Sequence, residues 1–133
     1  MSKKSKRGLK LPFLLPLGKI AAFYVPAQKM NEPQFGRDGQ TPTQIFDAFF
    51  LSSFGGLTHE KSSIQGRWVT EGGNKVFSDQ HERYEISFSG KRKLVELVTF
   101  LAEMCALLEE DSIYLMIGDR SWLVTPKDRQ AKT

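Results

Sequence analysis

The chain of 133 residues is 40% hydrophobic and 26% charged. That length and balance are typical of one soluble globular domain that can bury its own core. The single cysteine, Cys105, excludes an internal disulfide, and nothing in the composition points to an oxidising compartment. Because Cys105 falls on the apolar side of a strongly helical stretch, we predict that it is a small core residue.

The net charge of +4 is unevenly distributed along the chain. Between positions 11 and 125, 11 of the 19 basic residues meet 14 of the 15 acidic residues, which leaves this body at about −3. We therefore predict a basic and apolar arm at 1–17, a single domain at 18–125 and a disordered tail at 126–133. The arm would add weak, salt-sensitive contact with nucleic acid, although a solubilising role is favoured; its basic residues are Lys3, Lys4, Lys6, Arg7 and Lys10.

The apolar run Leu11–Leu17, LPFLLPL, follows the basic stretch as the core of a signal peptide would. It contains Pro12 and Pro16 and is cut short by Gly18-Lys19. A signal peptide has an uninterrupted apolar core, and a membrane-spanning helix needs about 20 apolar residues. The sequence therefore predicts no signal peptide, no membrane contact and a cytoplasmic location.

The first predicted elements are a strand and a helix. Lys19–Val25 (KIAAFYV) is rich in β-forming residues and apolar on both faces, as is typical of a central strand. Residues 27–40 have the composition of a loop. Thr41-Pro42-Thr43-Gln44 combines an N-cap, a first-turn proline and a capping-box glutamine, so a helix is predicted to begin there and to end at Gly55. Its apolar residues recur at spacings of three and four and are predicted to be core: Ile45, Phe46, Phe49, Phe50 and Phe54.

A hairpin is predicted next. Its strands are Ser63–Thr70 and Lys75–Phe88, joined by a turn at residues 71–74 (EGGN). The second half of the later strand alternates, with Tyr84, Ile86 and Phe88 on one face. Its first half, residues 77–80, breaks the alternation, so a bulge is predicted there.

A long helix and a second hairpin complete the predicted domain. Lys91–Glu110 has apolar residues at helical spacing, and its basic start and acidic end both oppose the helix dipole. We interpret those charges as a solvated face. Ile113–Ile117 and Ser121–Thr125 are predicted to pair through a tight turn.

The predicted order is β-α-β-β-α-β with an added strand. This is the ferredoxin-like plan of the α+β class, with both helices on one face of a mostly antiparallel sheet. We expect the open face to carry residues such as Trp68 and Tyr84 or their neighbours. Such a face would pair with another copy of the chain or hold a ligand.

Three motifs carry a resemblance to a known family. They are FGGLT after a helix, GRW in the following strand and D-x4-YEI from Asp79 to Ile86. With the long helix and hairpin that follow, they resemble a family of small bacterial α+β proteins without an assigned reaction. The resemblance covers about the last two-thirds of the chain and implies a ferredoxin-like fold, with no catalytic residues to carry over. Small proteins of this kind often occur on mobile elements.

The segment 54–88 holds both histidines and the candidate binding residues. His59-Glu60 would be a tuned base if the two side chains met, but neighbours on a strand point to opposite faces. Asp79, His81 and Glu82 would suggest metal binding together with His59, since Asp79 and His81 share a face and His59 would be a third ligand. Exposed polar residues are the favoured interpretation, and no metal or cofactor is predicted. The full candidate set is His59, Arg67, Trp68, Asp79, His81, Arg83 and Tyr84.

No motif in the sequence names a reaction. The glycines around Gly66-Arg67-Trp68 lack the lysine and the following helix of a phosphate-binding loop. No G-x-S-x-G nucleophile is present, and the candidate RNA-binding strand is acidic. We therefore predict a non-enzymatic binding or regulatory module that acts through contacts with an unidentified protein partner and self-associates as a homodimer. The alternatives are a small-ligand-binding protein or enzyme that uses His59, Asp79, His81 and Arg83, and a nucleic-acid-binding protein that uses the basic arm.

Overall fold

The computed structural model of the chain describes residues 11–69, 73 and 76–127. The basic stretch before position 11, most of the predicted turn at 71–74 and the tail from position 128 lie outside the described residues. Two helices and five strands account for the predicted elements. Two short 3₁₀ turns, η1 (Ala27–Lys29) and η2 (Pro33–Phe35), occupy the predicted loop. The elements are β1 (Lys19–Pro26), α2 (Pro42–Ser53), β2 (Thr58–Val69), β3 (Val76–Phe88), α3 (Lys91–Leu107), β4 (Ile113–Ile117) and β5 (Arg120–Val124).

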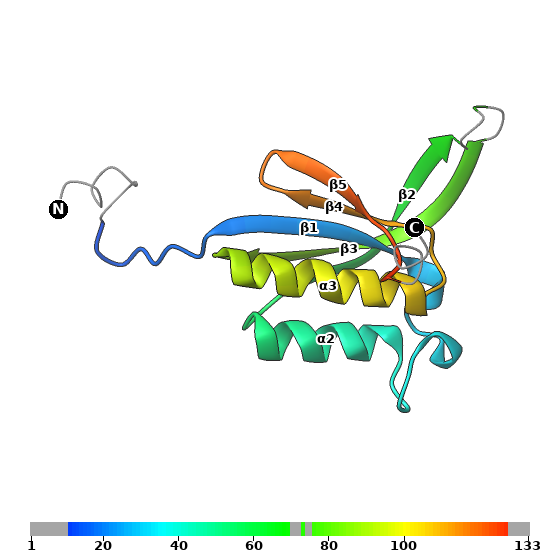
Figure 1. The fold of residues 1–133 in the computed structure, drawn as a ribbon, viewed down its shortest axis with the longest axis horizontal. Helices are drawn as coiled ribbons and strands as arrows, with labels where there is room; N and C mark the ends of the chain where they lie inside the picture. The colour runs from blue at the N-terminus through cyan, green and yellow to red at the C-terminus, as the bar shows by residue number, and fades with distance from the viewer. Residues whose placement is uncertain (1–10, 70–72, 74–75, 128–133) are drawn as a thin grey trace.

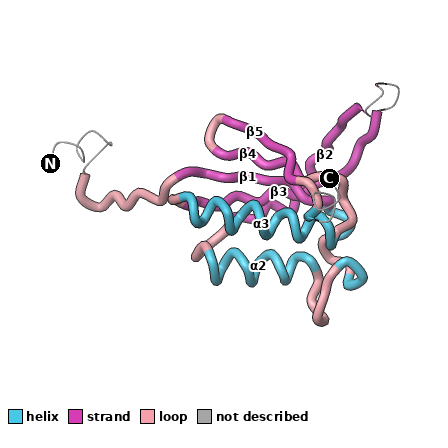
Figure 2. The backbone as a smooth tube through the Cα atoms, viewed as in Figure 1, coloured by secondary structure: helices cyan, strands magenta, loops and turns pink. Residues whose placement is uncertain are grey.

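The strands form one antiparallel sheet in the order β2-β3-β1-β4-β5. Both helices lie on the same side of this sheet, and the other side is open (Figure 1, Figure 2). The β2–β3 hairpin bends away from the helices at its far end, where it rises beside the β4–β5 hairpin (Figure 1). The chain is therefore an α+β fold, consistent with the ferredoxin-like class that the sequence predicts.

The start of α2 follows from the local sequence. The Thr41 hydroxyl accepts a hydrogen bond from the Gln44 amide, and the Gln44 side chain accepts one from the Thr41 amide. Both halves of the predicted capping box are therefore present, with Pro42 at the first helical position. At the other end Gly55 has a φ of 80°, the left-handed conformation that ends a helix.

Aromatic rings fill the core between the helices and the sheet. Phe46 and Phe50 of α2 are fully buried and pack against Phe23 of β1. Tyr84 of β3 stacks on the same Phe23 ring, with 5.3 Å between the ring centroids. The predicted aromatic core is confirmed, as is the burial of Cys105. Tyr84, however, faces the helices and is fully buried, so its predicted place on the open face is wrong.

The β2–β3 ladder differs from the prediction in two respects. β2 begins at Thr58, five residues before the predicted start, because Thr58 already pairs with Glu85. The irregularity also lies on β2, where three residues separate Glu60 from Ile64 while only one, Glu82, separates their partners on β3. The bulge predicted at residues 77–80 is therefore wrong, and pairing continues without a shift through Asp79 and Gln80. Extra residues on one strand increase local twist, in keeping with the bend of this hairpin.

The segment before β1 makes no part of the domain's core. Residues 11–17 continue from the start of β1 and extend beyond the ends of the strands (Figure 1). Their large apolar side chains are exposed. Among the described residues, no helix is both long enough and apolar enough to cross a membrane.

Candidate functional site

A cleft of about 620 Å³ lies on the open face of the sheet. One wall is the bent part of the β2–β3 hairpin, the other is β4–β5, and the loop after α3 closes one end. We call it the open-face cleft. Its volume is within the range of natural small-molecule sites. It is lined by Tyr24, Pro26, Ile64, Gln65, Gly66, Arg67, Trp68, Val69, His81, Glu110, Asp111, Ser112, Tyr114 and Leu123.

Aromatic side chains from three strands line this cleft. Tyr24 of β1 and Tyr114 of β4 stack with 5.9 Å between their ring centroids. On the opposite wall the ring of Trp68 meets His81 edge to face at 6.4 Å, and 47% of Trp68 is exposed. Such an arrangement presents flat apolar faces to a ligand, with a few polar groups nearby.

Glu110 and Asp111 form an acidic corner of the cleft. This corner is held in place by Lys29, which is far from it in the sequence. The Lys29 ammonium donates to the Leu108 carbonyl at 2.7 Å and to Glu110 Oε2 at 2.7 Å. It thereby binds a free carbonyl at the C-terminal end of α3 and offsets the acidic residues there, which would otherwise oppose the helix dipole. The acidic end that the sequence suggested was merely solvated therefore includes a bridged residue, Glu110, at the rim of the cleft.

Gly66 permits the close packing of β2 against the His81 side chain of β3, within one wall of the cleft. A Cβ atom at position 66 would lie 3.1 Å from the His81 ring. Gly66 is also paired with Asp79 in the ladder. The glycine of the GRW motif is thus a packing requirement of the cleft rather than part of a phosphate loop.

The seven predicted binding residues lie in different places. Arg67, Trp68 and His81 line the open-face cleft. Asp79 is outside its lining and accepts a hydrogen bond from the Gln80 amide at 2.8 Å. Arg83 is also outside it and binds Glu85 at 3.0 Å. That hydrogen bond to Glu85, with a smaller contribution from Tyr24, raises the pKa of the Arg83 guanidinium against the opposing effect of burial.

His59 and Tyr84 belong to the opposite face of the sheet. They are direct partners in the β2–β3 ladder, and their rings stack at 4.1 Å. His59 Nε2 lies 2.7 Å from Glu82 Oε1, and both side chains are almost fully buried. Glu82, which is 7% exposed, is the single buried charged residue in the described part of the chain. The partner of His59 is therefore Glu82, while Glu60 points to the other face as predicted.

The Tyr84 hydroxyl has an unusual environment. It is buried and makes no hydrogen bond of regular geometry with any described atom. Burial raises the pKa of Tyr84 far above its ordinary value of 10.0, and the negative charges of Asp47 and Glu82 raise it further, while a weaker hydrogen-bonding interaction with the Thr43 side chain lowers it. The Thr43 hydroxyl itself donates to the Met30 carbonyl. Inside the core, the side chains of His59 and Glu82 therefore bond to each other, and the neighbouring Tyr84 hydroxyl lacks a regular hydrogen bond.

This placement decides the question of a shared site. His59 lies on the helix-facing side of the sheet and His81 on the open side, so they cannot both bind one metal or ligand with Asp79 and Arg83. The structure therefore does not bring the four residues of the predicted alternative into one site, and small-ligand binding itself stays a prediction. Among the described residues, no group of three or more His, Cys, Asp or Glu is placed to hold a metal ion.

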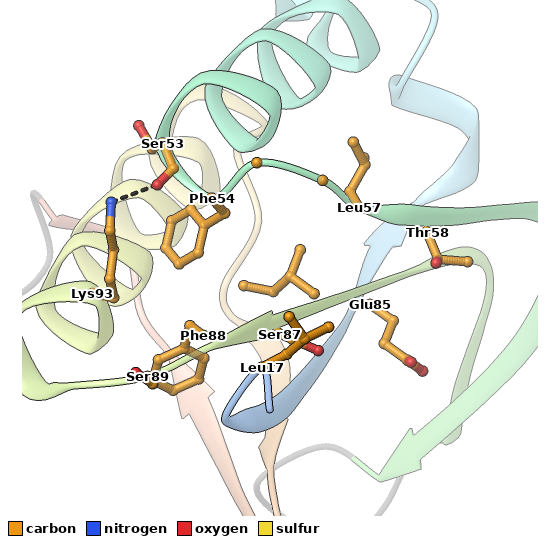
Figure 3. A pocket seen from close by; sticks show the side chains of 13 residues that line it. Leu17, Ser53, Phe54, Leu57, Thr58, Glu85, Ser87, Phe88, Ser89 and Lys93 are labelled. Atoms are coloured by element: carbon orange, nitrogen blue, oxygen red, sulfur yellow. Dashed lines mark hydrogen bonds between the residues drawn. The ribbon is translucent and has the colours of Figure 1, made fainter. Parts of the chain in front are cut away.

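A second cavity of about 540 Å³ lies at the end of α2 (Figure 3). The FGGLT motif, residues 54–58, forms one side of it, and the last residues of β3 form the other. Phe54 and Phe88 face this space, with Lys93 and Leu17 at its edge (Figure 3). The Lys93 ammonium is already bound to the Ser53 carbonyl and to Glu96. The FGGLT and GRW motifs therefore line two different cavities.

Several residues of the open-face cleft were missed by sequence reasoning. Tyr24 and Tyr114 are 90 positions apart and meet only because β1 pairs with β4. Glu110 reaches the rim through its bond to Lys29, which no local pattern signals. The burial of Glu82 was also missed, although a hairpin extended back to Thr58 would have placed it near His59.

Comparisons with known proteins reveal the fold and little else. No protein-family model matches the chain, and no curated protein matches it. Two solved structures have a similar fold. One is a phage SAM lyase in complex with S-methyl-5'-thioadenosine, with a TM-score of 0.56 and 13% identity. The other is a phage SAM lyase in the apo state, with a TM-score of 0.52 and 14% identity. Each match covers 89% of this chain and 98% of the other. At this identity the likeness concerns the fold alone, and the resemblance to a bacterial family stays a prediction.

Proposed function

We propose that the open-face cleft binds a small adenosine-containing metabolite of the SAM (S-adenosylmethionine) class. The observation that carries the proposal is the chemistry of the lining. Three aromatic side chains, Tyr24, Trp68 and Tyr114, surround a space of about 620 Å³ with Glu110 and Asp111 at one end. This combination suits a ligand with a flat aromatic base and a positive charge.

Each part of such a ligand finds a matching group in the cleft. A purine ring stacks on aromatic faces, and the electron-rich faces of Trp and Tyr attract a sulfonium or ammonium group within about 6 Å. The acidic corner favours the same positive charge. Ribose hydroxyls pair with side chains that both donate and accept, and Gln65 and Ser112 are of this type.

The fold likeness is consistent with this class of ligand. A phage SAM lyase with a similar fold is known in complex with S-methyl-5'-thioadenosine. That comparison suggests the compounds to test first. It does not carry a reaction to this chain, and the His59–Glu82 pair lies on the face of the sheet opposite the cleft.

Thermal unfolding of the full chain with and without SAM, S-methyl-5'-thioadenosine, adenosine or methionine tests the proposal. Ligands that bind only the folded state raise the melting temperature in proportion to the logarithm of their concentration. We expect SAM and S-methyl-5'-thioadenosine to raise it and methionine to have little effect. SAM carries a positive charge, whereas S-methyl-5'-thioadenosine is neutral. The rise in melting temperature caused by SAM should therefore decrease more steeply with added salt than the rise caused by S-methyl-5'-thioadenosine.

The two tryptophans provide a matched pair of variants. Trp68→Ala removes an aromatic wall of the cleft, whereas Trp122→Ala removes an equally exposed indole from β5 outside the lining. We expect the ligand effect to be lost in Trp68→Ala and kept in Trp122→Ala. No response to any adenosine compound would exclude the proposed ligand class, and equal responses of both variants would place the site elsewhere. Mass spectrometry of SAM after incubation with the protein distinguishes a binding protein from an enzyme.

A further inference from the structure

The segment Leu11–Leu17 is an apolar arm without a covering surface in the single chain. Leu15 and Leu17 are 83% and 66% exposed, and Phe13 is fully exposed. Apolar surface of this extent is rarely left in water unless it serves an interaction. We call this segment the apolar arm. Figure 1 shows that it extends past the ends of the strands, in continuation of β1.

The conformation of Phe13 indicates that the arm presents this ring. Leu11 to Leu14 form a turn closed by a bond from the Leu14 amide to the Leu11 carbonyl, with Pro12 in second position. Phe13 occupies the third position with a φ of 78°. That position of such a turn favours Gly or Asn, and a bulky residue there is strained. A fully exposed aromatic ring held at a strained turn suggests selection for contact rather than for local stability.

The open face of the sheet carries a matching apolar surface. Ile20, Met116, Tyr114 and Leu123 all point to this face by the strand register, and we call them the open-face strip. Ile20 and Leu123 are 53% and 65% exposed. Both described helices lie on the other side of the sheet (Figure 1, Figure 2). The strip runs from the start of β1 to the rim of the open-face cleft, which Tyr114 and Leu123 also line.

Gly18 holds the arm off the strip of its own chain. Its φ is 101°, and a Cβ atom there would lie 2.1 Å from the Phe88 carbonyl oxygen. The base of the arm is thus packed tightly on the end of β3 and directed outward. Folding back over β1 would require a reversal within two residues at this packed position.

We infer that the apolar arm of one copy of the chain docks on the open-face strip of a second copy, with Phe13 packed against Tyr114 and Leu123. The charges set the direction of docking. Five basic residues precede the arm in the sequence, and the acidic corner, Glu110 and Asp111, borders the Tyr114 end of the strip. With Phe13 at that end, the basic stretch meets the acidic corner of the second copy. Because Tyr114 and Leu123 also line the open-face cleft, the docked arm and the metabolite proposed for that cleft would compete for these two residues.

Sedimentation velocity of the full chain and two variants tests the inference. Phe13→Gly removes the ring and relieves the strained turn, so it leaves folding intact. Leu123→Glu places a charge on the strip, and Ile20→Lys is a second acceptor variant in case the first is poorly folded. We expect the wild type to self-associate and each variant to weaken the association by about tenfold or more. Val95→Glu, at an exposed apolar position on α3 outside the strip, is the control and should associate as the wild type does.

Mixing the variants separates arm docking from other modes of pairing. Phe13→Gly keeps an intact strip and Leu123→Glu keeps an intact arm, so a mixture of the two restores one arm–strip contact. We expect the mixture to associate more strongly than either variant alone. A wild type that stays monomeric at high concentration would overturn the inference. So would a Phe13→Gly variant that associates like the wild type, because the sheets would then pair face to face without the arm. Arm docking is measured by sedimentation without ligand, whereas metabolite binding is measured by the thermal response to adenosine compounds, so either proposal can fail while the other holds.

Discussion

His59 and Tyr84 are direct partners across the β2–β3 ladder, and their rings stack at 4.1 Å on the helix-facing side of the sheet. This contact ties the entry of the long hairpin to the aromatic core, because Tyr84 also stacks on Phe23. Glu82 completes the arrangement by binding His59 Nε2 at 2.7 Å. The His59–Glu82 pair is therefore part of the packing between the sheet and the helices and lies outside the open-face cleft.

Removal of one member of the His59–Glu82 pair should destabilise the fold. His59→Leu leaves a buried carboxylate without its partner, and breaking such a pair costs about 3–5 kcal/mol. The double variant His59→Leu/Glu82→Leu removes the orphaned charge and should recover much of that loss. Urea unfolding of the wild type, both single variants and the double variant measures the coupling. If His59→Leu is as stable as the wild type, the pair does not hold the hairpin to the core.

The buried phenol predicts a loss of stability in alkali. The pKa of Tyr84 is raised in the folded state, chiefly by burial, from an ordinary value of 10.0. The unfolded chain therefore releases this proton at a lower pH than the folded chain does. The contribution of Tyr84 to stability is fully present below about pH 10 and is lost progressively as the pH rises above it. Tyr84→Phe has no proton to release, so its unfolding free energy should decline less between pH 9 and about pH 11 than that of the wild type.

Tyr84→Phe is also informative at neutral pH. The variant removes a buried hydroxyl that makes no hydrogen bond of regular geometry, a group whose burial costs about 1–3 kcal/mol. We therefore expect the variant to be at least as stable as the wild type at pH 7. A clear loss of stability would reveal a bond to the hydroxyl, from Thr43 or through a buried water molecule.

The local elements could be predicted from sequence, and the cleft could not. The start of α2 was predictable because Thr41, Pro42 and Gln44 act on one another within one turn. The alternation through Tyr84 was predictable too, but which face the helices cover depends on tertiary packing. For that reason the prediction that Trp68 and Tyr84 both lie on the open face failed for Tyr84, which is fully buried. Tyr24 and Tyr114 carry no shared signal along the chain, since only the register of β1 with β4 brings them together.

Gly66 should be required for the shape of the open-face cleft. In Gly66→Ala the new methyl group meets the His81 ring at 3.1 Å, so this ring, which lines the cleft, must shift. Overpacking of this kind costs about 1 kcal/mol or more of stability, and we expect the displaced ring to weaken binding of the proposed metabolite by about fivefold, which is about 1 kcal/mol. Gly56→Ala is the matched control, because no atom lies within 4 Å of the added carbon. Calorimetric titration of both variants with SAM makes the comparison, and equal affinities would remove His81 from the site.

Lys29 should contribute far more to the free energy of unfolding than Lys127, which forms an exposed ion pair. Its ammonium binds the Leu108 carbonyl and Glu110 at 2.7 Å each, and the side chains of the ion pair are only 24% and 22% exposed. Lys29→Met keeps the apolar stem but loses these charged hydrogen bonds, at a cost of about 1.5–3 kcal/mol. Lys127→Met is the control, since Lys127 reaches Glu103 only at 3.5 Å in an exposed pair and such pairs contribute about 0–1 kcal/mol. Because Lys29 also neutralises Glu110 in the acidic corner, Lys29→Met leaves that carboxylate uncompensated and should strengthen the binding of positively charged SAM relative to that of neutral S-methyl-5'-thioadenosine. Urea unfolding and titration of the two variants decide both points, and equal stability of the two would show that Glu110 is placed by the loop itself.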